Sequence, residues 1–234
     1  MSTVLHEVER RVLGVLLEKS LAQPSYYPMT LNAVVTACNQ KSNRQPVMDL
    51  NEDRVWAALD ALKQMGLVSR LLPGGGSRVD RFRHEVKQVL AWEKPQRAVM
   101  AELLLRGPQT VGELRSHAAR MYPFENPAAV SAVLDSLAQS DPPMVTVVAP
   151  APGQSATRYA HLLCPVAEQP AATATPVAAP APAASAPAAD DEAEERLGGE
   201  GFQRQLDDLH AEMAELREAV AELKRRLPAP EQEM

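Results

Sequence analysis

The sequence predicts a mainly α-helical fold with small β-hairpins, an α+β class in which one module occurs twice in tandem. Apolar residues recur at helical spacing in several segments of residues 1–165. Short runs typical of β-strands follow each group of helices, and turns rich in glycine or proline separate them. The order of elements in residues 1–92 is repeated in residues 93–165. We therefore expect two small domains with these bounds.

The first module is expected to hold three helices and a hairpin. The first helix covers residues 3–21, with an apolar stripe formed by Leu5, Val8, Val12 and Leu16. Thr30 is a good N-cap for the second helix, whose apolar face is formed by Leu31, Val34, Val35 and Cys38. The third helix begins near Asn51 and ends at Gly66. The runs LVSRLL and RVDRFRHEV, joined by PGGGS, then complete a winged helix.

The second module repeats this order. Its three helices are expected in RAVMAELLLRG, TVGELRSHAARM and NPAAVSAVLDSLAQS, and its hairpin in PMVTVV and ATRYAHLL. Thr110 and Glu113 form a capping box, and Pro127 suits the first position of the third helix. The pairs Arg81/Arg158 and Phe82/Tyr159 have the same separation along the chain, so we interpret the two segments as copies of one winged helix.

The remaining chain has a different composition. Residues 166–200 are rich in alanine and proline and then acidic, which predicts a disordered, extended linker. Residues 201–228 carry a heptad seam, which predicts a short coiled coil and a homodimer. The dimerisation residues are Leu206, Leu209, Met213, Leu216, Val220, Leu223 and Leu227. The alternative is a single amphipathic helix that packs back on the globular part.

Charge and cysteine content limit the class of protein. Residues 1–92 hold 12 Lys/Arg against 9 Asp/Glu, whereas residues 166–234 hold 6 against 15, so the acidity belongs to the tail. The N-terminus has no secretory pattern, and no apolar run is long enough to span a bilayer. We expect a cytoplasmic protein without a membrane partner. Cys38 and Cys164 are expected to be reduced core thiols.

Catalytic and metal-binding patterns are absent from the sequence. Gly74–Gly76 lacks the Lys-Ser/Thr pair and the helix of a phosphate-binding loop, and no nucleophile has a neighbouring base. No Cys or His lies at ligand spacing. We therefore expect a protein that is not an enzyme and needs no cofactor or metal.

One stretch combines features that helix formation alone does not require. The segment YYPMTLNAVVTACNQKSNRQPV joins two tyrosines, a self-capped helix and a turn rich in amides and cations. Together with ERRVLGVLLEKSL, MYPF and RYAHLL, it resembles the bacterial YceH-like family of tandem winged-helix proteins. The resemblance covers about residues 2–165 and the C-terminal coiled coil. It implies the tandem winged-helix fold but no established activity.

The first hypothesis is a dimeric DNA-binding regulator. Arg81 and Arg83 alternate with Phe82, so both arginines project from one face of the hairpin. The third helix opposes this reading, because Glu52, Asp53 and Asp60 make its outer face acidic. The candidate contacts to duplex DNA are Asn39, Gln40, Lys41, Asn43, Arg44, Arg78, Arg81 and Arg83.

The second hypothesis is a protein-interaction scaffold that grips a partner through Tyr26, Tyr27 and Pro28. A purely structural role also remains open, in which the tyrosines and prolines staple the loop over the first helix and Asn43 caps the second. The arginines discriminate between these hypotheses. Their convergence on one basic surface favours DNA, whereas their pairing with carboxylates such as Asp80 or Glu85 favours a protein partner.

Overall fold

The computed structural model describes residues 4–72, 79–148 and 156–169. Within these ranges the protein is a mixed α+β fold of seven α-helices and two small antiparallel sheets. Both repeats lie in one compact unit, Met1–Pro176. The predicted coiled coil, most of the predicted linker, the Gly74–Gly76 turn and Arg78 lie outside the described residues.

Local signals place the helices of the first repeat, and the structure confirms them. The Thr30 side chain accepts a hydrogen bond from the Ala33 N–H at 3.3 Å, and the Asn51 side chain accepts one from the Arg54 N–H at 3.0 Å. Gly66 follows the third helix with φ +75°, a conformation that favours glycine. The elements are α1 (Glu7–Ala22), the 3₁₀ turn η1 (Pro24–Tyr26), β1 (Met29–Thr30), α2 (Leu31–Cys38), α3 (Glu52–Gln64), β2 (Val68–Leu71) and β3 (Arg81–His84).

The second repeat has the same order of three helices and a hairpin. The Thr110 N–H donates to Glu113 Oε2 at 2.7 Å, and the Glu113 N–H donates to Thr110 Oγ1 at 3.2 Å, so the capping box is confirmed. Pro127 is the first residue of its helix. The elements are α5 (Lys94–Arg106), α6 (Val111–Ala118), α7 (Pro127–Ala138), β4 (Val145–Val148) and β5 (Arg158–His161).

Four short elements of the described residues were not predicted, namely η1 and the three that follow. β1 pairs with β3 through Met29 and Phe82, so the first sheet has three strands in the order β1-β3-β2. The one-turn helix α4 (Val86–Val89) follows β3. The 3₁₀ turn η2 (Val166–Glu168) occupies residues assigned to the linker, and Glu168 forms an ion pair of 2.7 Å with Arg10. Each is too short to leave a periodic signal in the sequence.

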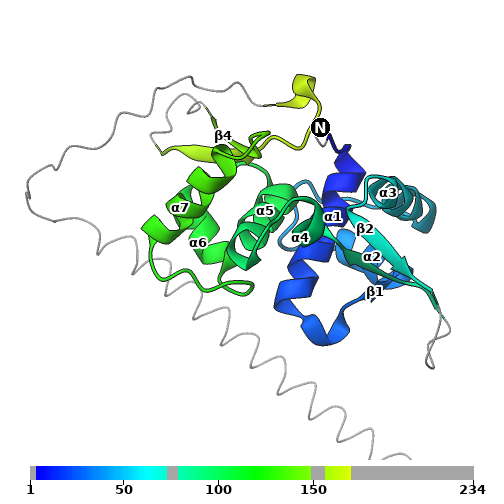
Figure 1. Ribbon diagram of the computed structural model, residues 1–234. Helices are drawn as coiled ribbons and strands as arrows, with labels where there is room; N and C mark the ends of the chain where they lie inside the picture. Colours follow the sequence, from blue (N-terminus) through cyan, green and yellow to red (C-terminus); the bar gives the residue numbers. More distant parts are fainter. Residues whose placement is uncertain (1–3, 73–78, 149–155, 170–234) are drawn as a thin grey trace, which may run out of the picture. The chain divides into compact units, whose positions relative to one another are not determined.

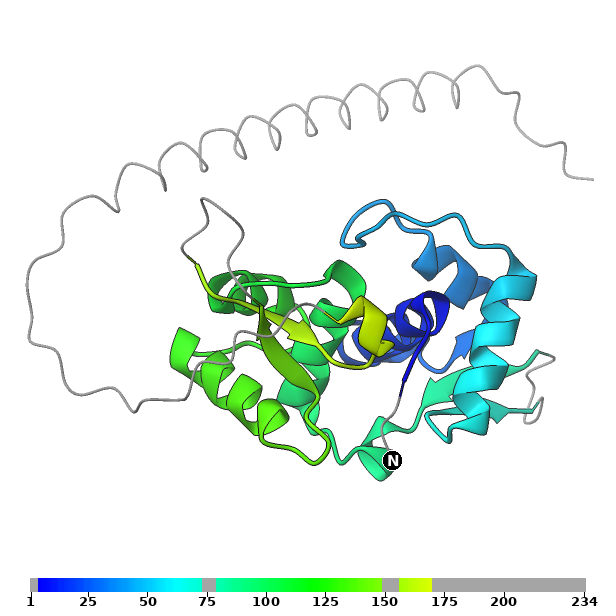
Figure 2. The ribbon, with the colours of Figure 1, turned by 90° about the horizontal axis from the view of Figure 1, so that it is seen from above.

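The two repeats share a continuous hydrophobic core. Helix α1 is buried without interruption from Arg11 to Glu18, because it lies between α3 of its own repeat and α5 of the next (Figure 1). Helices α1 and α5 approach closely at Gly14, where an added Cβ would lie 3.0 Å from Leu105. Helix α3 adjoins the hairpin β2–β3, both in cyan in Figure 2. Residues on either side of the predicted boundary at 92/93 therefore belong to one core.

Candidate functional site

Arg44, a predicted DNA contact, is buried between the two repeats. Its Nη2 lies 2.6 Å from Oε2 of Glu18, its Nη1 lies 3.2 Å from Oε1, and its Nε donates to the Ala37 carbonyl at 3.0 Å. Neither the Arg44 nor the Glu18 side chain is exposed. A guanidinium in this position does not reach a phosphate, so Arg44 is corrected from a surface contact to a core residue.

The amides predicted as base contacts also bind the protein itself. Asn39 Nδ2 donates to the Leu50 carbonyl at 2.8 Å, and Asn39 Oδ1 accepts from the Leu50 N–H at 2.8 Å. Gln40 Oε1 accepts from Arg44 Nη2 at 2.9 Å. Asn43 Oδ1 accepts from Arg106 of the second repeat. Asn43 therefore joins the repeats and does not cap α2, whose C-cap is Asn39.

Arg44 belongs to an ion cluster, defined as Glu18, Glu102, Arg44, Arg106 and Arg120, whose two carboxylates are buried. Glu102 on α5 is fully buried like Glu18, and its Oε2 lies 2.9 Å from Arg106 Nε. Arg120 Nη2 bridges the repeats, at 2.5 Å from Glu18 Oε1 and 3.2 Å from Glu102 Oε1. The sequence analysis missed Glu18 and Glu102. Their only signal is a carboxylate next to a leucine, near the C-terminal end of each of the two helices.

A second arginine fixes the chain segment that follows α2. Arg11 is 1% exposed, and its guanidinium donates to the carbonyls of Cys38 at 3.1 Å and Pro46 at 2.5 Å. The Gln45 N–H donates to the Leu105 carbonyl at 2.8 Å. The turn that the sequence marked as exceptional thus runs between α1 and α5, and its residues Asn39, Gln40, Asn43 and Arg44 make contacts within the protein.

The hairpin arginines are neutralised by nearby carboxylates. Arg83 Nε lies 2.7 Å from Glu85 Oε1, and Arg70 Nη2 lies 2.5 Å from Asp80 Oδ2. The Arg70 guanidinium also lies over the Trp56 ring, 5.0 Å from its centroid. Arg81 differs, because its Nη1 donates to the Pro28 carbonyl at 2.8 Å and it forms no ion pair within the described residues. The predicted contact Lys41 is exposed as well.

The outer face of α3 has both signs of charge. Glu52, Asp53 and Asp60 are exposed there, together with Arg54 and Lys63. The two carboxylates in the first turn oppose a phosphate at the helix N-terminus. This face lacks the excess of positive charge that a duplex requires.

Tyr26 and Tyr27, two predicted partner contacts, have opposite environments. Tyr26 is 75% exposed, whereas the Tyr27 hydroxyl accepts from the His84 N–H at 2.5 Å. Burial raises the pKa of the Tyr27 phenol. The Pro28 carbonyl accepts from Arg81. Tyr27 therefore fixes the loop to β3 through this hydrogen bond. Of the two tyrosines, Tyr26 is the one whose ring is accessible to a partner.

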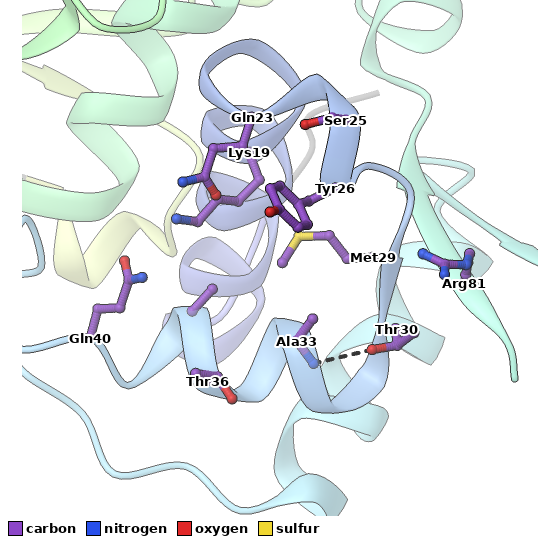
Figure 3. Close-up of a pocket in the computed structure, with 11 residues that line it drawn as sticks. Lys19, Gln23, Ser25, Tyr26, Met29, Thr30, Ala33, Thr36, Gln40 and Arg81 are labelled. Atoms are coloured by element: carbon purple, nitrogen blue, oxygen red, sulfur yellow. Dashed lines mark hydrogen bonds between the residues drawn. The ribbon is translucent and has the colours of Figure 1, made fainter. Parts of the chain in front are cut away.

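Tyr26 borders a groove on the surface of the first repeat (Figure 3). The groove has a volume of about 490 Å³ and lies between the end of α1, η1, α2 and β3. In the view of Figure 3, Tyr26 and Met29 lie between Lys19 and Arg81. The lining residues are Lys19, Gln23, Ser25, Tyr26, Met29, Thr30, Ala33, Thr36, Ala37, Gln40 and Arg81.

The residues that the structure describes include no group of three or more His, Cys, Asp or Glu side chains that could hold a metal ion. Cys38 and Cys164 are both buried and free, and burial raises the pKa of each thiol, to about 12 for Cys38. In the same described ranges, every helix is too short or too polar to cross a membrane.

Comparison with known proteins places the chain in a family. The family model described as a protein of unknown function, DUF480, matches residues 5–154. UPF0502 protein GSU0233 of Geobacter sulfurreducens is 52% identical over 163 residues, which are 70% of this chain and 74% of that protein. A UPF0502 protein of Geotalea daltonii is 51% identical over 162 residues, 69% of this chain and 73% of its own length. This chain therefore belongs to the DUF480 family, whose members include bacterial UPF0502 proteins.

Proposed function

We propose that this protein is a non-enzymatic interaction protein, in which two winged helices with a shared core present a binding surface to a partner protein. The tandem winged-helix assignment, as in the YceH-like proteins that the sequence resembles, is supported by the repeated order of three helices and a hairpin. The predicted coiled coil would make the protein a homodimer.

The observation that carries the proposal is a contrast on the surface of the first repeat between paired arginines and an exposed aromatic ring. Arg70 and Arg83, which a DNA-binding wing would present to phosphates, are paired with carboxylates two to ten residues away. Tyr26 instead presents an exposed aromatic ring at the rim of a groove. Exposed tyrosines are typical of protein-binding surfaces, because they bury a large area at a low cost in conformational entropy.

DNA binding remains a second candidate because of Arg81 and Lys41. Both side chains are exposed, and within the described part of the chain Arg81 is hydrogen bonded to a carbonyl and not to a carboxylate. A coiled-coil dimer would present these cations twice, and their spacing would then set the separation of two half-sites.

The deciding experiment compares duplex DNA with protein partners. Fluorescence anisotropy of the full-length chain with a labelled duplex should show no binding down to about 50 mM salt. Tagged full-length protein, cross-linked in its own host, should retain a defined protein that, once purified, binds stoichiometrically in calorimetry. The result that overturns the proposal is duplex binding with a steep salt dependence, whose slope falls by about 2 in the Arg81→Ala/Arg83→Ala variant.

A further inference from the structure

The groove bordered by Tyr26 is chemically asymmetric. Among the described residues that line it, Lys19 and Arg81 are cationic and none is acidic. The remaining polar lining consists of hydroxyl and amide groups such as Thr36 and Gln40, which bind either donors or acceptors. A ligand that complements this lining carries negative charge.

Lys19 shares the nearby carboxylate of Glu18 with two arginines. Its Nζ lies 4.0 Å from Glu18 Oε2, and the same carboxylate already binds Arg44 at 2.6 Å and Arg120 at 2.5 Å. The Lys19 side chain is 12% exposed. Burial lowers the pKa of its ammonium, and the nearby charges act in both directions, because Glu18 raises this pKa whereas Arg44 and Arg120 lower it. The ion cluster thus leaves, at the wall of the groove, a mostly buried cation that shares its carboxylate with two arginines.

The floor of the groove is apolar and small. Ala33 and Ala37 of α2 both line the groove, one helical turn apart in the sequence. In Figure 3, Met29 lies between Tyr26 and Ala33. Small residues on a helix leave room for a side chain that enters between Met29 and the Tyr26 ring. The volume of about 490 Å³ is in the range of a site for one or two side chains and is far too small for a nucleic-acid duplex.

We propose that the groove binds an acidic peptide segment of the partner protein, with an aromatic or branched apolar side chain on Ala33 and Ala37 and carboxylates at Lys19 and Arg81. This proposal rests on the proposed function and specifies its partner. The partner's carboxylate supplies the counter-charge that Lys19 lacks, and its apolar side chain covers Met29 and part of the exposed Tyr26 ring.

The test uses full-length protein and a set of fluorescein-labelled peptides in which Phe, Leu or Trp is flanked by Asp and Glu. Matched peptides carry Asn and Gln at the flanking positions. Arg81→Gln should weaken binding of the best acidic peptide about ten-fold, the usual effect of losing one charge-assisted hydrogen bond. Thr36→Trp fills the groove from an exposed position of α2 and should abolish binding.

Arg54→Gln is the matched control, because Arg54 is exposed on α3 and does not line the groove. This variant should leave the affinity for the peptide unchanged. Exchange of the peptide's apolar residue between Leu and Phe should change the affinity by no more than a few-fold. Arg81→Gln tests the same groove if Thr36→Trp fails to fold.

Three outcomes overturn the proposal. Acidic and amide peptides could bind equally well or not at all, the Thr36→Trp protein could bind like the wild type, or single-stranded DNA could displace the peptide and bind more tightly. Binding of the purified host partner distinguishes failure of the acidic-peptide proposal from failure of the proposed interaction function. If that partner binds the wild type and both groove variants equally, the interaction function stands and the groove is not its site.

Discussion

Arg44 Nη2 lies 2.6 Å from Glu18 Oε2, and neither side chain is exposed to solvent. A buried bidentate pair of this kind needs further hydrogen bonds to offset the desolvation of both charges. Arg44 obtains them from the carbonyl of Ala37 and the amide of Gln40, and Glu18 from Arg120 of the second repeat. Arg44 of the exceptional turn therefore contributes to the contact between the repeats.

Glu18→Gln should lower the free energy of unfolding by about 3–5 kcal/mol, because Arg44 would remain buried without its counter-charge. Urea denaturation of the full-length chain, followed by far-UV circular dichroism, measures this change. Glu7→Gln on the same helix is the matched control, since Glu7 is exposed. A loss no larger for Glu18→Gln than for Glu7→Gln would show that the ion cluster does not hold the repeats together.

Gly14→Ala should destabilise the protein by about 1–3 kcal/mol, because the new methyl group would press on a buried side chain. The added Cβ would lie 3.0 Å from both Cγ and Cδ2 of Leu105, which is fully buried and cannot move aside freely. At Gly112 the nearest atom is 4.0 Å away, so Gly112→Ala should stabilise helix α6 by about 0.5–1 kcal/mol. Thermal unfolding compares the two variants, and equal effects would contradict the close approach of α1 and α5.

Stability should fall as the pH is lowered from about 6.5 to 4. Burial lowers the pKa of His84 and of His161 to about 4, so the folded protein favours the neutral rings. The stabilisation is complete above the pKa of the unfolded chain, near 6.5, and is lost as the pH falls towards 4. Each ring contributes up to about 3 kcal/mol.

Urea midpoints across this pH range test the assignment. Replacement of His161 by Asn should flatten the pH profile, and so should replacement of His84. Profiles of both variants that run parallel to the wild type would assign the acid sensitivity to other groups.

Cys38 and Cys164 should not react with a thiol reagent in the native protein. Both are buried, and their raised pKa keeps the thiols protonated and unreactive near neutral pH. Both should react fully in denaturant, which gives the internal control for Ellman's assay. Rapid native labelling of either cysteine would contradict its burial.

Periodicity and capping residues determined the local structure of this protein. Thr30, Asn51, Thr110 and Pro127 start helices in the structure as they do in the sequence pattern, and Gly66 ends one. Such signals are read over a few neighbouring residues, so they need no knowledge of the rest of the chain. The repeated order of elements in residues 7–161 was predictable for the same reason.

Only the tertiary structure decided which charged residues are exposed. Lys41 and Arg44 stand three positions apart in one polar turn, yet Lys41 faces solvent and Arg44 meets Glu18, 26 residues earlier in the chain. The groove likewise depends on α1, α2 and β3 coming together, because Lys19 and Arg81 lie on separate elements. Burial and ion pairing depend on residues distant in sequence, so a local sequence pattern does not predict which charged side chains are buried or paired.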